Sequence, residues 1–121
     1  MRKSILGSGL AILVSGLAST VVVADEATTM AGEQLFESHA CINCHGAGGN
    51  APVSKLVPVL AGKPADELHQ KATKILSGEG GTEESKLMHA AIFSPANCNA
   101  PPSDDEVKAI TDWLAAQPTP Q

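Results

Sequence analysis

Two cysteines and a histidine within five residues are the most chemically informative feature of this sequence. Cys41 and Cys44 are three positions apart, and His45 follows directly. On one helical turn both thiols can reach the same haem and add to its two vinyl groups, while the adjacent imidazole is held against the iron. The spacing therefore predicts one covalently attached haem c, bound through Cys41 and Cys44, with His45 as the proximal iron ligand.

Other sites that are built on paired cysteines fit this sequence less well. A disulfide between Cys41 and Cys44 would not require His45, and a thioredoxin-like site requires a βαβ surrounding that the sequence lacks. A structural zinc site requires further ligands, and no second pair of cysteines or histidines has the usual spacing. We therefore favour haem over these three alternatives.

The sixth iron ligand is expected to be a methionine or a histidine, and Met88 is the best candidate. It follows His45 by 43 residues, which allows the chain to wrap round to the distal side of the haem. Met30 lies ahead of the motif, on the helix that leads into it, and is badly placed for this role. His89 is the alternative ligand, and Met88 could also be an ordinary core filler. An open sixth position would instead indicate a five-coordinate haem protein that binds ligands.

The first 24 residues have the parts of a secretory signal peptide. Arg2 and Lys3 precede an apolar, small-residue run from Ile5 to Ala24, and Asp25 follows. We predict cleavage after Ala24 and export to the periplasm, with an uncleaved membrane anchor as the alternative. No stable membrane insertion is expected after cleavage, because no other stretch of the sequence is apolar enough.

The chain that remains after this predicted cleavage is acidic. Its six basic and thirteen acidic side chains give a net charge of −7. Such a charge argues against nucleic acid as a partner, because phosphates require a basic surface. It favours redox partner proteins with a basic docking patch, because complementary fields raise the rate of encounter.

Helical patterns flank the motif on both sides, and no strand pattern is present. We predict an all-α fold of four to five helices around one haem. The domain is expected over residues 30–117, between a flexible lead at 25–29 and a flexible tail at 118–121.

Capping signals and apolar spacing place the individual helices. The first is expected over about 30–40, capped by Thr28 or Thr29. The second begins near Pro64 and stops at Gly78, and the third covers 84–93. The last is the clearest, because a capping box of Ser103 and Glu106 precedes an apolar stripe; the stripe consists of Val107, Ile110 and Leu114, with Trp113 beside it.

The order of these features resembles that of class I cytochromes c. The features are Gly32 and Phe36, the motif Cys41–Gly46, the stretch Pro58–Gly62, Met88, and the segment Ser103–Leu114 with its Trp113. Within that class the chain is similar to the small bacterial periplasmic mono-haem type and to a single domain of cytochrome c4. The resemblance implies an electron carrier whose iron alternates between Fe(III) and Fe(II), and not an enzyme.

The resemblance also assigns roles to residues outside the motif. The Pro58 carbonyl is expected to accept a hydrogen bond from the His45 imidazole, which would orient the ring and tune the iron. Leu60 is expected to pack on the haem. Gly32 and Phe36 are expected to meet the last helix near Trp113.

Two features depart from the pattern of these relatives. Many relatives have a proline soon after the ligand methionine, whereas His89 follows Met88 here. Cys98 is a third cysteine, left over once Cys41 and Cys44 bind haem, and such a cysteine can form a disulfide to a partner subunit. The alternative function is therefore a cytochrome subunit of a larger oxidoreductase, such as a sulfur-compound dehydrogenase. The simpler interpretation of Cys98 is a small buried residue.

Overall fold

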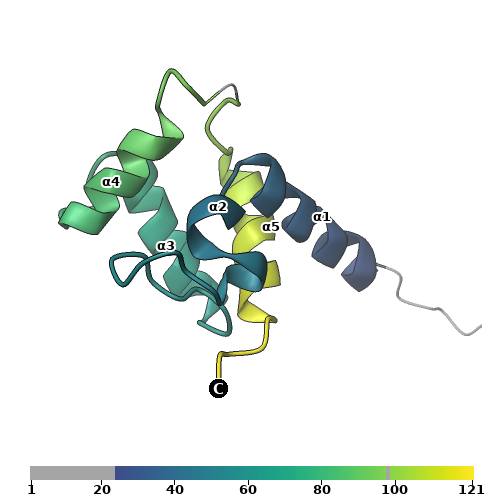
Figure 1. The fold of residues 1–121 in the computed structure, drawn as a ribbon. Helices are drawn as coiled ribbons and strands as arrows, with labels where there is room; N and C mark the ends of the chain where they lie inside the picture. The colour runs from purple at the N-terminus through teal and green to yellow at the C-terminus, as the bar shows by residue number, and fades with distance from the viewer. Residues whose placement is uncertain (1–23, 98) are drawn as a thin grey trace, which may run out of the picture.

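The described residues form an all-helical fold, as predicted. The computed structural model describes residues 24–97 and 99–121, and it contains no strand in these ranges (Figure 1). Its elements are α1 (Ala24–Ser38), α2 (Ile42–His45), the short 3-10 helix η1 (Ala47–Gly49), α3 (Ala65–Leu76), α4 (Glu83–Ile92) and α5 (Asp104–Ala115). None of the helices in this part of the chain has both the length and the apolar character needed to cross a bilayer.

The first and last helices cross at close range and form the core of the fold (Figure 1). Gly32 is the point of closest approach, since a Cβ there would lie 2.6 Å from the carbonyl oxygen of Ala109. Next to it the rings of Phe36 and Trp113 pack with centroids 5.3 Å apart and tilted by 48°. Phe36 is only 1% exposed. The expected meeting of Gly32 and Phe36 with the last helix near Trp113 is therefore present.

Local capping signals explain where α5 and α4 begin. The Ser103 hydroxyl accepts a hydrogen bond from the Glu106 amide, and the Glu106 carboxylate accepts one from the Ser103 amide. This is the capping box predicted from the sequence. Thr82 and Ser85 form a second capping box at the start of α4, which the sequence analysis did not identify.

The second predicted helix is also present, with its expected start and stop. Pro64 immediately precedes α3, where its φ of −55° suits a helix start and its missing amide donor costs nothing. Gly78 ends the segment at a φ of +80°, in the left-handed region that favours glycine. The third predicted helix, expected over 84–93, is α4, displaced by one residue at each end.

The expected bounds of the first helix were wrong at both ends. α1 begins at Ala24, so residues 25–29, including the expected caps Thr28 and Thr29, lie within it. Alanine and glutamate have high helix propensity, and no glycine or proline interrupts this stretch, so nothing local stops the helix from extending. α1 ends at Ser38, earlier than expected, because Ala40 adopts a left-handed φ of +60°. The predicted signal segment ahead of Ala24 lies outside the described residues, as does Cys98.

Candidate functional site

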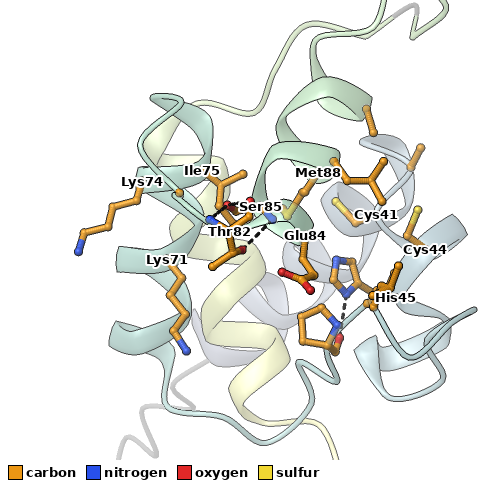
Figure 2. Close-up of a pocket in the computed structure, with 17 residues that line it drawn as sticks. Cys41, Cys44, His45, Lys71, Lys74, Ile75, Thr82, Glu84, Ser85 and Met88 are labelled. Carbon is orange, nitrogen blue, oxygen red and sulfur yellow. Dashed lines mark hydrogen bonds between the residues drawn. The ribbon is translucent and has the colours of Figure 1, made fainter.

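The cysteine–histidine motif occupies a single helical turn. The left-handed Ala40 reverses the chain after α1, and Cys41 caps α2. The amides of Cys44 and His45 both donate to the Cys41 carbonyl, at 3.2 and 3.0 Å. This turn places Cys41, Cys44 and His45 on the wall of one cavity (Figure 2).

The His45 ring is buried and has a defined orientation. The side chain is 5% exposed, and its Nδ1 lies 3.0 Å from the Pro58 carbonyl oxygen. Because a carbonyl can only accept, Nδ1 carries the proton and donates it. Nε2 of the neutral ring is therefore left with a free lone pair. This is the hydrogen bond that was expected between Pro58 and His45, and it fixes the orientation of the ring.

The surroundings of His45 favour its neutral form. Burial lowers the pKa of His45, and the hydrogen bond to the Pro58 carbonyl opposes this shift in part. A neutral imidazole with a lone pair on Nε2 is the form that binds a metal.

Backbone hydrogen bonds hold the loop that carries Pro58 and Leu60. The Val53 amide donates to the Cys44 carbonyl at 3.0 Å, and the Leu60 amide donates to the Gly49 carbonyl at 2.8 Å. Leu60 is partly buried and packs against the core cluster that contains Phe36 and Trp113. The loop is thereby tied to the motif at one end and to the core at the other.

The cavity beside the motif is mainly apolar and has two connected parts. The outer part has a volume of about 380 Å³ and the inner part about 160 Å³. They adjoin, because they share the lining residues Cys41, His45, Pro58, Lys71, Ile75 and Met88. The outer volume lies within the range of roughly 300–1,000 Å³ that is usual for ligand sites.

Met88 and Leu60 line this cavity, and His89 does not. Met88 projects from α4 toward the space that also receives the side chains of Cys41 and His45 (Figure 2). Leu60 lines the inner part. His89 faces α3, where its Nδ1 bonds to the Ile75 carbonyl. The structure therefore brings together all six residues predicted for the site, and it turns the alternative ligand His89 away from it.

Several further lining residues were not assigned to the site from the sequence. Ile75, Leu68 and Ala72 line the inner part from one face of α3, and their helical spacing was the signal available in the sequence. Glu84 lines the outer part from the first turn of α4, four residues ahead of Met88 and so on the same helix face. The spacing of four residues from Met88 was the sequence feature that could have placed Glu84 at the site.

The surroundings of the Cys41 thiol do not favour a zinc site. Burial raises the pKa of the Cys41 thiol to about 11, so this thiol is protonated at neutral pH. A zinc-bound thiol must instead be deprotonated. Residues 24–97 and 99–121 also contain no cluster of three or more His, Cys, Asp or Glu side chains that could hold a metal ion.

The residues that are present fit a covalently bound haem. Two thiols on one helical turn lie beside an imidazole whose free nitrogen is Nε2. A thioether side chain comes to the same cavity from α4, and the walls are apolar enough for a porphyrin. Cys44 is exposed, so the edge of the haem that is bonded to this residue would lie at the protein surface.

Comparison with known proteins agrees with this assignment. The family model described as cytochrome c matches residues 29–117. A search of curated proteins gives no match.

Proposed function

The chain belongs to the cytochrome c family and carries covalently attached haem c, and on this premise we propose that it is a periplasmic one-electron carrier. The observation that carries the proposal is the meeting of His45, from α2, and Met88, from α4, at one apolar cavity. Two protein ligands to the iron would leave no open position, and that is a property of electron carriers rather than of ligand-binding haem proteins.

Under this proposal His45 and Met88 would bind the haem iron, one from α2 and the other from α4. The haem supplies the chemistry, an iron that alternates between Fe(III) and Fe(II). His45 is held by Pro58, so its ring keeps one orientation in both oxidation states. Met88 contributes a neutral sulfur, and methionine ligation raises the reduction potential. Leu60 and the apolar face of α3 exclude water from the inner cavity.

Electrons enter and leave at the mouth of the cavity in this proposal. Leu56 and Leu87 line the outer part and are 60% and 59% exposed, so they form an apolar rim beside Cys44. An apolar rim around an exposed cofactor edge allows close approach of a second redox protein. The acidic side chains Asp104 and Asp105 are exposed at the start of α5 and do not line the cavity. We propose that they steer a partner with a basic patch.

The periplasmic location rests on the sequence of the first 24 residues, with their basic start and apolar run. Mass spectrometry of the protein from an exporting host tests it. A mass that begins at Asp25 supports export with cleavage, whereas retention of the first 24 residues contradicts cleavage and indicates the uncleaved anchor.

Absorption spectroscopy tests the ligand assignment directly. The protein is made in a host that attaches haem c, and spectra are recorded oxidised and reduced. We expect the weak red charge-transfer band of a methionine–Fe(III) bond, absent in Met88→Ala and retained in Lys86→Ala, an exposed change on the same helix. A high-spin spectrum with rapid carbon monoxide binding would contradict the carrier proposal and indicate a ligand-binding haem protein. Co-purification with a catalytic subunit would instead indicate a subunit of an oxidoreductase.

A further inference from the structure

His89 makes a defined contact with a neighbouring helix although it lies next to the proposed iron ligand. Its Nδ1 is 2.7 Å from the Ile75 carbonyl oxygen, and its ring packs on Phe93 with centroids 4.5 Å apart. The carbonyl can only accept, so Nδ1 carries the proton and donates. The proton is thus fixed on the nitrogen that faces α3.

The acceptor is a backbone carbonyl in the last turn of α3. Carbonyls in that turn, such as the one of Ile75, have no partner within the helix. The Gly78 amide also donates to this carbonyl, at 3.0 Å. Ile75 itself lines both parts of the cavity, as Met88 does. The hydrogen bond from His89 therefore joins two walls of the same site.

Because both residues lie on one helix, the contact made by His89 also affects the direction of the Met88 side chain. Neighbouring residues on an α-helix point about 100° apart, so a ring anchored on α3 sets the direction of the side chain before it. The second half of α4 has two other contacts: Ile92 lines the inner part of the cavity, and the Ile92 carbonyl accepts a hydrogen bond from the Asn97 side chain. Ser85 is the only buried residue of α4, and Leu87 is largely exposed. The Thr82–Ser85 capping box fixes the N-terminal end of α4, whereas Met88 lies in the second half.

We propose that His89 is a positioning residue, which holds α4 in the rotation that directs Met88 at the iron through its hydrogen bond to the Ile75 carbonyl. This inference rests on the proposed ligation by Met88. Without the bond, α4 can turn or lift from α3 while the rest of the fold stays intact. The methionine would then leave the iron more often, and an external ligand could take its place.

The test is the affinity of the oxidised holoprotein for added imidazole, which competes with Met88 for the iron. His89→Phe keeps a flat ring against Phe93 but removes the donor. A hydrogen bond contributes roughly 0.5–1.5 kcal/mol, so we expect imidazole to bind about 2- to 13-fold more tightly in His89→Phe than in the wild type. His89→Asn places an amide N–H as many bonds from the backbone as Nδ1 and is expected to restore most of the wild-type affinity.

A matched control separates positioning from general loosening of the helix. Ala90→Gly, at an exposed site of α4, weakens the helix and leaves the hydrogen bond in place. We expect the imidazole affinity of Ala90→Gly to stay near that of the wild type. An equal increase in imidazole affinity in Ala90→Gly and His89→Phe would overturn the inference about His89. So would the absence of any increase in His89→Phe. Neither result would affect the assignment of Met88 as the ligand. Absence of the methionine–Fe(III) band in the wild type would overturn the ligand assignment, and the inference with it.

Discussion

The close crossing of α1 and α5 predicts that alanine in place of one helical glycine lowers the stability of the protein, although alanine is normally favoured within a helix. Gly32 lies in α1 and faces α5. A Cβ at this position would lie 2.6 Å from the Ala109 carbonyl oxygen and 3.1 Å from Cγ of Trp113, and it would be closer still to Cβ of Trp113. These atoms belong to the α5 backbone and to a buried ring, so they cannot move aside as a flexible surface side chain would.

Two opposing effects set the size of the change in Gly32→Ala. Alanine is favoured over glycine within a helix by about 1 kcal/mol. Overpacking of a well-packed core costs about 1–3 kcal/mol, and a clash with backbone puts this case in the upper half of that range. We expect a net loss of about 1–2 kcal/mol in the free energy of unfolding, which corresponds to roughly 4–16 °C in Tm for a domain of this size.

Guanidinium unfolding of the oxidised holoprotein measures this loss. The midpoint of unfolding should fall while the slope with denaturant stays unchanged, because the surface exposed on unfolding is the same. Glu33→Ala, an exposed change one residue further along α1, is the control and should shift stability by less than about 0.5 kcal/mol. If Gly32→Ala proves as stable as the wild type, or more so, the close helix crossing is refuted.

Three further changes test the core and the α5 cap. Phe36→Ala should lower the free energy of unfolding by about 3–5 kcal/mol, because it removes a fully buried ring and leaves a cavity. Denaturant unfolding measures this loss, and a loss under about 1 kcal/mol would argue against the burial of the ring. Ser103→Ala should cost about 1 kcal/mol in the same assay through loss of the helix cap, and an unchanged midpoint would contradict the capping role. Hydrogen bonding to the Ser103 amide lowers the pKa of Glu106 in the folded protein. Its stabilisation is therefore present above the unfolded carboxyl pKa, near 4.3, and is lost as the pH falls through the lower folded value. The stability difference between the wild type and Glu106→Ala should shrink between pH 6 and pH 3, whereas a difference that is independent of pH would exclude the carboxylate as its source.

Features that depend on a few consecutive residues could be predicted from the sequence. The Cys41–His45 spacing identified the haem attachment site because all three groups belong to one helical turn. The Ser103–Glu106 box and the stop at Gly78 are equally local, since each involves atoms no more than a turn apart. The extent of α1 was missed, because its end depends on a left-handed Ala40, a conformation that alanine rarely adopts and no pattern signals.

Contacts between distant segments were decided by the tertiary structure. The sequence predicted Met88 as a ligand, but it could not determine which of the two neighbouring side chains, Met88 or His89, faces the cavity. Only the packing of α4 against α3, with the His89 bond to Ile75, turns one side chain into the cavity and the other away. The hydrogen bond from His45 to Pro58 was predicted from the family resemblance and not from spacing, since the two residues lie thirteen positions apart, with η1 and a loop between them. Such contacts depend on the path of the whole chain, whereas the motif and the caps depend on the geometry of a single turn.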